Sequence, residues 1–242
     1  MYKIEILYPE VANLYGDHFN AELLRRSYPD DIEVKETHLN DEPLFPSGCV
    51  DLIYMGAMPE KYQDMAIELL RPYTDALKNY IESGKPALFT GNSFEILGEY
   101  IQDADRKIPC LGIYKGYAVR DMMNRYNSMY LGEVAIPEGP LKIVGFKSQF
   151  SKTFGLEEGM HFIHTLRERD EANSSVDEGV RINNFFGTYL TGPFLIMNPK
   201  FGVYLLSLMG IQNPKLVFEE ELVYSYEKRL EEALNSSTNF AV

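Results

Sequence analysis

The chain has 242 residues, of which 45% are hydrophobic and 13% aromatic, enough for a sizeable core in one or two domains. Its formal net charge of −13 argues against binding a nucleic-acid backbone by bulk electrostatics. Two cysteines are too few for a disulfide framework or a four-cysteine zinc site, although they leave room for one catalytic thiol. No apolar run approaches the ~18 residues of a membrane span and no signal peptide is recognisable, so we expect a cytoplasmic protein.

The first half of the chain alternates between strand and helix patterns. Short apolar runs predict strands at residues 2–8, 32–37, 51–55 and 86–90. Helical spacing of apolar residues is found at 13–27, at 60–83 with a break at Pro72, and at 94–101. Strands that alternate with helices are typical of a parallel sheet with crossover helices.

The second half is richer in strand patterns. Glycine-punctuated runs predict strands at 111–119, 130–136, 142–146, 161–166 and 181–190, with an exposed polar loop at 168–179. Two closing helices are expected at 201–209 and 218–234, the last of them acidic. We therefore predict an α/β fold, a mostly parallel sheet flanked by helices with extra β structure in its second half. It forms one domain over residues 1–235, followed by a frayed C-terminal tail at 236–242.

Ligands of such sheets bind beyond the C-terminal ends of the strands. Three loops are expected there, at residues 13–20, 56–58 and 91–93. A sharp turn after a strand is where α/β enzymes place a nucleophile, and the 91–93 turn suits that role. In the alternative, purely structural interpretation, Gly91 makes a tight turn and Asn92 or Ser93 caps the following helix.

Four segments, in order along the chain, resemble one enzyme family. They are Leu7-Tyr8-Pro9 with Asn13-Leu14-Tyr15-Gly16-Asp17 and Asn20, Phe94-Glu95-Ile96-Leu97-Gly98, Ile143-Val144-Gly145-Phe146, and Gly187-Thr188-Tyr189-Leu190-Thr191-Gly192-Pro193. Together they are similar to class I glutamine amidotransferases of the cobyric-acid-synthase-like branch, and most of all to the glutaminase subunits of lipid II isoglutaminyl synthases. The resemblance implies a flavodoxin-like layering and the release of ammonia from glutamine for a synthetase partner.

The resemblance also implies two reacting side chains that this chain lacks. Family members place a cysteine nucleophile at the elbow, where Gly91 stands here, and a histidine in the late segment, where Thr191 stands. The cysteines, Cys49 and Cys110, precede strand runs at the opposite end of the sheet and are interpreted as packing residues. No histidine lies beyond residue 164, so none can serve the late segment.

The remaining polar residues give a predicted pocket without a confident catalytic group. An unactivated hydroxyl such as Ser93 is a poor nucleophile, and His18 lies in a loop where histidines usually face solvent. His161 and His164 have no carboxylates at ligand spacing, so no metal or cofactor is expected. The predicted pocket residues are Tyr15, Gly16, Asp17, Asn20, Gly56, Ala57, Gly91, Asn92, Ser93, Thr191 and Gly192.

Taken together, these features predict an amidotransferase-like protein that has lost glutaminase catalysis. Its expected role is a binding, regulatory or structural subunit of a Mur-ligase-like or other ATP-dependent synthetase, in cell-wall precursor amidation or cobalamin biosynthesis. A small ligand such as glutamine is an alternative partner, whereas nucleic acid and a membrane span are not expected. The rival interpretation is an active enzyme that hydrolyses glutamine with residues around Ser93 and His18.

Overall fold

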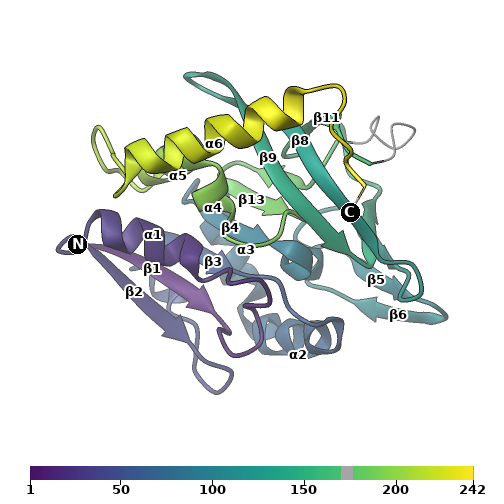
Figure 1. The fold of residues 1–242 in the computed structure, drawn as a ribbon. Helices are drawn as coiled ribbons and strands as arrows, with labels where there is room; N and C mark the ends of the chain where they lie inside the picture. The colour runs from purple at the N-terminus through teal and green to yellow at the C-terminus, as the bar shows by residue number, and fades with distance from the viewer. Residues whose placement is uncertain (170–176, 242) are drawn as a thin grey trace.

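The centre of the molecule is a six-stranded sheet in the order β12-β13-β4-β3-β1-β2 (Figure 1). The structure is a computed structural model that describes residues 1–169 and 177–241. All neighbouring strands of this sheet are parallel except the edge strand β12, which is antiparallel to β13. Its strands are β1 (Tyr2–Leu7), β2 (Ile32–Thr37), β3 (Leu52–Met55), β4 (Ala87–Thr90), β12 (Val180–Ile182) and β13 (Phe185–Thr188).

Helices cover both faces of this sheet, so side chains of one strand enter two different cores. In β3, Ile53 and Met55 pack with α2 and α3, whereas Leu52 and Tyr54 pack with α1, α4 and α5. These helices are α1 (Phe19–Ser27), α2 (Glu60–Leu70), α3 (Thr74–Glu82), α4 (Phe194–Met197) and α5 (Pro199–Leu208), with short 3₁₀ turns η1 (Phe45–Ser47) and η2 (Arg71–Tyr73). No described helix is both long and apolar enough to cross a membrane. The predicted α/β layering is confirmed.

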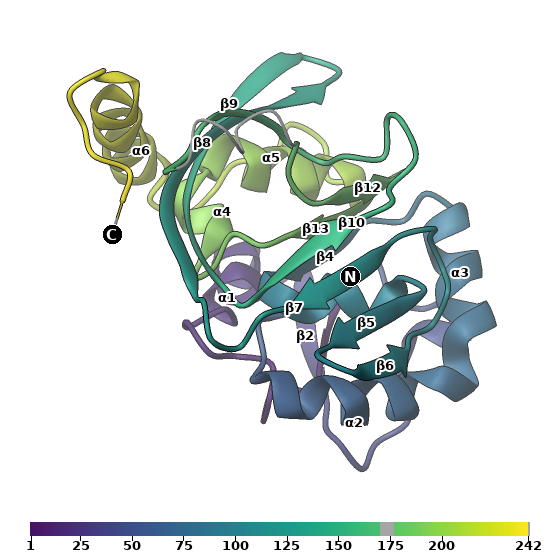
Figure 2. The ribbon, with the colours of Figure 1, turned by 90° about the vertical axis from the view of Figure 1, so that its right-hand side faces the viewer.

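Two smaller sheets supply the additional β structure of the second half. One has the order β10-β7-β5-β6 and lies at the end of the molecule away from α6 (Figure 2). The other, β11-β8-β9, contains a long antiparallel hairpin along which α6 (Glu219–Leu234) lies (Figure 1). Their strands are β5 (Tyr100–Asp103), β6 (Arg106–Pro109), β7 (Tyr117–Arg120), β8 (Tyr126–Ile136), β9 (Gly139–Gln149), β10 (Ser151–Phe154) and β11 (His164–Arg167).

The segment after β4 differs from the prediction of a helix at 94–101. Residues Gly91–Leu97 form a 3₁₀ helix, η3, and the chain then enters β5. The carbonyl of Ile96 accepts from the amide of Leu111, and that of Leu97 accepts from the amide of Ile113. Because these carbonyls bond to a distant segment, the helical ladder cannot continue. The predicted helix at 13–27 is also shorter, since residues before α1 form turns.

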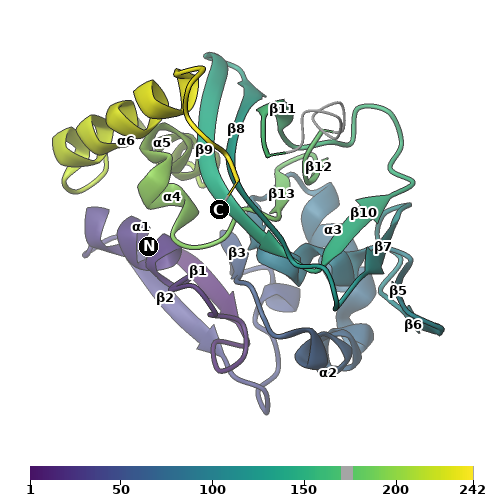
Figure 3. The same cartoon turned by 45° about the vertical axis from the view of Figure 1, so that its right-hand side comes forward.

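The predictions for the end of the chain were partly wrong. Most of the expected loop at 168–179 lies outside the described residues. The expected frayed tail instead returns to the β8–β9 hairpin, as Figure 3 shows. The carbonyl of Phe240 accepts from the amide of Met129 at 3.0 Å, and its ring is 4% exposed. Burial of one aromatic ring thus anchors the segment that composition alone marked as frayed.

Truncation of Phe240 should lower the free energy of unfolding, because its ring packs with Leu131, Val144 and Tyr226. For Phe240→Ala we expect a loss of about 2–4 kcal/mol, measured by urea denaturation. The matched variant Phe218→Ala removes a ring that is 63% exposed and should cost less than about 0.5 kcal/mol. Equal losses in the two variants would contradict the anchored C-terminus.

Candidate functional site

The loops after β1, β3 and β4 meet at the C-terminal edge of the central sheet, as predicted. The amide of Leu14 donates to the carbonyl of Ala57 at 3.2 Å, which joins the first loop to the second. The Asp17 carboxylate accepts from the amide of Tyr15 at 3.0 Å and from the Thr90 hydroxyl at 3.2 Å. Burial raises the pKa of Asp17, and these hydrogen bonds oppose that increase. Asp17 therefore connects the first loop to the end of β4.

Asn20 fastens the late segment to the same edge. Its amide nitrogen donates to the carbonyl of Asp17 and to the Tyr54 hydroxyl, both at 2.9 Å. Its amide oxygen accepts from the amide of Leu195 at 2.8 Å. Asn20 is fully buried, and a truncation would leave several of these groups without partners. The polar residues that the sequence placed in the pocket thus serve mainly to hold the loops together.

Gly91, which the sequence resemblance aligned with the family nucleophile, has no space for a side chain. An ideal Cβ on Gly91 would lie 2.3 Å from the Cβ and 2.9 Å from the Cα of Ala57. The backbone of Gly91 has φ +64°, a conformation that residues with a side chain seldom adopt. Ala57, in the loop after β3, therefore occupies the volume that a nucleophilic side chain would need.

Backbone groups of the loop after β3 are already hydrogen bonded. The Asn92 side chain forms a two-way clamp with Met58, accepting from its amide at 3.0 Å and donating to its carbonyl at 2.8 Å. The backbone of Ala57 bonds to the Asp17 carboxylate. An oxyanion hole requires donors aimed at the developing charge, and the Met58 amide is engaged by Asn92 instead.

Thr191, which the sequence resemblance aligned with the family histidine, is held by strand β9. Its amide and its hydroxyl both donate to the carbonyl of Phe146, at 2.9 and 3.1 Å. A threonine hydroxyl cannot act as a general base at neutral pH, and this one is committed to a backbone acceptor. The Thr191 side chain is therefore committed to a structural contact with β9.

The space left between these segments is a void of about 30 Å³. This is close to the volume of one water molecule. Of the predicted pocket residues, Tyr15, Ala57, Gly91, Asn92 and Thr191 line it, whereas Gly16, Asp17, Asn20, Gly56, Ser93 and Gly192 do not. The wall also contains residues that the predicted pocket did not include, among them Arg125, Gln149, Phe150 and Tyr189. Most of these come from the inserted β structure.

Ser93 and His18 are not placed as a nucleophile and its base. Ser93 is fully buried, and its hydroxyl donates to the carbonyls of Thr90 and Met55 at 2.8 and 3.2 Å. Burial lowers the pKa of His18, whose Nε2 has no hydrogen-bond partner among the described residues. Cys110 is buried as expected, but Cys49 is exposed, which corrects its interpretation as a packing residue.

A buried polar network lies directly beneath the elbow. Glu95 is 1% exposed and accepts from the hydroxyls of Ser151 and Tyr189 and from the Gln63 side chain. Gln63 in turn accepts from Arg120 at 2.6 Å. Burial raises the pKa of Glu95, although its hydrogen bonds oppose the increase. The network ties η3 to α2, β7, β10 and the segment after β13. Nowhere in the described ranges do three His, Cys, Asp or Glu side chains gather as metal ligands.

Comparison with known proteins identifies the class to which this fold and site belong. Residues 3–199 match the model of the CobB/CobQ-like glutamine amidotransferase domain, so the chain belongs to this family. The resemblance inferred from the sequence is confirmed.

Two relatives are lipid II isoglutaminyl synthase (glutamine-hydrolyzing) subunits GatD. That of Streptococcus pneumoniae is 25% identical over 198 residues, covering 79% of this chain and 74% of the relative. That of Staphylococcus aureus is 29% identical over 192 residues, covering 77% and 75%.

Solved structures agree on the fold. PurLQS from Thermotoga maritima has a TM-score of 0.54 at 13% identity, covering 95% of this chain and 99% of that chain. A glutamine amidotransferase crystal structure has a TM-score of 0.53 at 15% identity, covering 86% and 99%.

The raised pKa of Glu95 predicts a specific pH dependence of stability. Above pH 4.5, the ordinary pKa of a glutamate, Glu95 loses its proton in the unfolded chain but keeps it in the folded protein. The free energy of unfolding therefore falls as the pH rises from 4.5 towards the raised pKa of folded Glu95. Glu95→Gln cannot titrate. Urea denaturation between about pH 4.5 and 8 should show the variant gaining stability relative to the native chain as pH rises.

Glu22→Gln is the control with the opposite sign. Hydrogen bonds and charge from Arg25 and Arg26 lower the pKa of Glu22 to about 2, so its contribution is present above 4.5 and lost towards acid pH. This variant should therefore lose stability relative to the native chain as pH rises from the acid side. A difference between native chain and Glu95→Gln that does not vary with pH would contradict the assignment.

Proposed function

We propose that this chain is a glutamine amidotransferase-like subunit without glutaminase chemistry, which acts as a binding, regulatory or structural partner of an ATP-dependent synthetase. The observation that carries the proposal is the closed elbow, where Ala57 occupies the space of a side chain on Gly91. The reaction of the family needs a thiolate, a base and an oxyanion hole. An enzyme that lacks its nucleophile and base retains at most the effects of binding and of the oxyanion hole.

The nature of the partner follows from the relatives. Both GatD proteins are named as subunits of a lipid II isoglutaminyl synthase, so a second subunit that performs the synthetase chemistry is part of the proposal. A Mur-ligase-like synthetase in cell-wall precursor amidation, acting in the cytoplasm, fits these names better than a cobalamin enzyme does. Retention of the whole family domain, from residue 3 to 199, supports a docking role that needs the folded scaffold.

An active enzyme built on Ser93 and His18 is not favoured. The Ser93 hydroxyl donates to two backbone carbonyls and is sealed from solvent, so a substrate cannot reach it. Activation of the hydroxyl would also require a base within hydrogen-bond distance, and both of its observed contacts are carbonyl oxygens. Ser93 does not line the space of about 30 Å³ at the elbow, so that space gives a substrate no access to its hydroxyl.

Glutaminase activity tests the proposal directly. We expect the purified chain to release no glutamate from L-glutamine above the level of a heat-denatured control. The assay is repeated on the complex purified with a tagged full-length chain, after confirming that the complex contains an ATP-hydrolysing synthetase. The reacting groups are missing in either state, so the partner should not restore activity.

Two outcomes would contradict this expectation. Glutamate release that disappears in Ser93→Ala would establish an enzyme with a different nucleophile. A chain that remains free of any synthetase during purification at low salt, where charged interfaces are strongest, would remove the partner from the proposal.

A further inference from the structure

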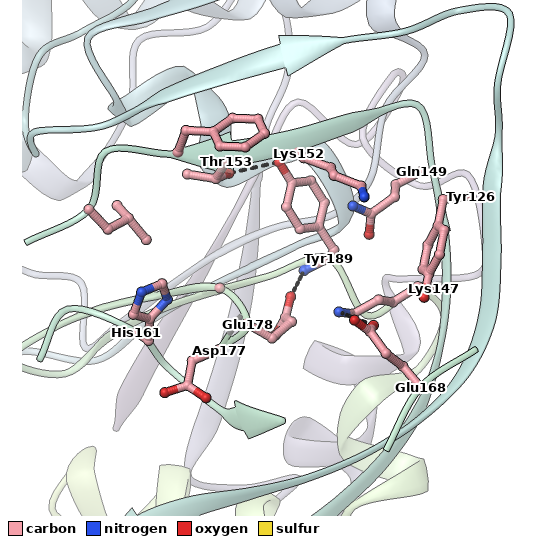
Figure 4. A pocket seen from close by; sticks show the side chains of 13 residues that line it. Tyr126, Lys147, Gln149, Lys152, Thr153, His161, Glu168, Asp177, Glu178 and Tyr189 are labelled. Carbon is pink, nitrogen blue, oxygen red and sulfur yellow. Dashed lines mark hydrogen bonds and ion pairs between the residues drawn. The ribbon is translucent and has the colours of Figure 1, made fainter. Parts of the chain in front are cut away.

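A second cavity, of about 370 Å³, lies on the other side of Tyr189 from the elbow. This volume falls within the range of small-molecule sites. Figure 4 shows Lys152 and Gln149 together at one end of the cavity, His161 at the other end, and Tyr189 between them. Leu156 and Phe154 add apolar surface. The cavity is therefore large enough for a ligand that the closed elbow cannot hold.

The carboxylates of the wall already have partners. Lys147 pairs with Glu168 at 3.0 Å, and both side chains are less than a tenth exposed. Glu178 accepts from the amide of Tyr189 at 2.6 Å and from the Thr188 hydroxyl at 2.9 Å. The acidic groups of the cavity are thus committed to protein contacts, and they offer a ligand little additional binding.

Two buried atoms of the wall lack a hydrogen-bond partner within the described part of the chain, and a third group of the wall is an exposed ammonium. Gln149 donates its amide nitrogen to the carbonyl of Ser151 at 2.7 Å, but its Oε1 is buried without a donor. The Nδ1 of His161 is likewise buried and unbonded. The Lys152 ammonium forms no ion pair with a described residue and lies 5.5 Å from the centre of the Tyr126 ring. Buried polar atoms are normally hydrogen bonded, so the Gln149 Oε1 and the His161 Nδ1 call for a ligand or for water. The exposed Lys152 ammonium adds a positive charge to the same wall.

The Lys152 ammonium and the unbonded atoms of Gln149 and His161 indicate which chemical groups a ligand should carry. An ammonium ion on the cavity wall attracts a carboxylate, and the neighbouring amide oxygen requires a donor. A free α-amino acid carries a carboxylate and an ammonium group on one carbon, and Lys152 and Gln149 lie together (Figure 4). A side chain that passes Tyr189 and ends in an amide could hydrogen bond His161 in either tautomer, because an amide both donates and accepts.

We propose that this cavity binds a free amino acid with an amide side chain, its carboxylate on Lys152, its ammonium on Gln149 and its amide on His161. The inference rests on the proposed function and specifies what the non-catalytic subunit binds. Tyr189 belongs both to this cavity and to the wall of the elbow void, and its hydroxyl donates to Glu95 at 2.8 Å. A bound ligand thus contacts the network that supports the elbow.

Isothermal titration with L-glutamine tests the inference on the full-length chain. Binding should occur, and Lys152→Met and His161→Phe should each weaken it at least about tenfold. Glutaramate, which lacks the α-ammonium, should bind more weakly than glutamine because Gln149 then receives no donor. The matched control is Lys107→Met, which removes a lysine that also lies over a tyrosine ring but outside the cavity, and it should leave binding unchanged.

The outcomes separate this inference from the proposed function. Absence of binding at about 5 mM L-glutamine, or equal binding by native chain and both cavity variants, would overturn the inference. If His161→Phe does not fold, the exposed Lys152 carries the test alone. Release of glutamate in the same samples would instead contradict the non-catalytic function. In that case, the binding measured for Lys152→Met and His161→Phe would still show whether the amino acid binds in this cavity.

Discussion

The turns after β3 and β4 approach so closely that no further side chain fits between Ala57 and Gly91. The positive φ of Gly91 adds a conformational reason for glycine at this residue. The neighbouring contacts also hold these two turns together, because the side chains of Asp17 and Asn92 accept hydrogen bonds from the backbone of the loop after β3. The space left at this edge of the sheet has a volume of only about 30 Å³.

In the proposed function, this molecule keeps the family scaffold without the family chemistry. Asp17 and Asn20 have a structural role that does not depend on catalysis, because they join the first loop to β4 and to the late segment. A fold alone does not confer an activity, and here the local geometry determines what the scaffold can do. The larger cavity beyond Tyr189 has the volume and the unfilled polar groups that the elbow lacks. This larger cavity is therefore the better candidate for binding a small ligand.

Much of the architecture could be predicted, because buried apolar runs separated by helices define a parallel sheet whatever the details of packing. The same pattern failed at 94–101, where apolar residues at helical spacing form a 3₁₀ turn and a strand. The deciding hydrogen bonds come from residues 111–114, which no local pattern contains. The same holds for the site. Its loop residues were predictable, whereas Gln149 and Phe150 reach it through the packing of the inserted β8–β9 hairpin.

A double-mutant cycle between Gly91 and Ala57 tests the central claim most directly. Gly91→Cys alone should cost about 2–4 kcal/mol of unfolding free energy, from the close contact and the backbone conformation. Added to Ala57→Gly, the same change should cost at least about 1 kcal/mol less, since the opposing methyl group is gone. The part of the loss that comes from the positive φ of residue 91 should remain in the double variant. Costs that add within about 0.3 kcal/mol would mean that Ala57 does not close the elbow, and would contradict the account.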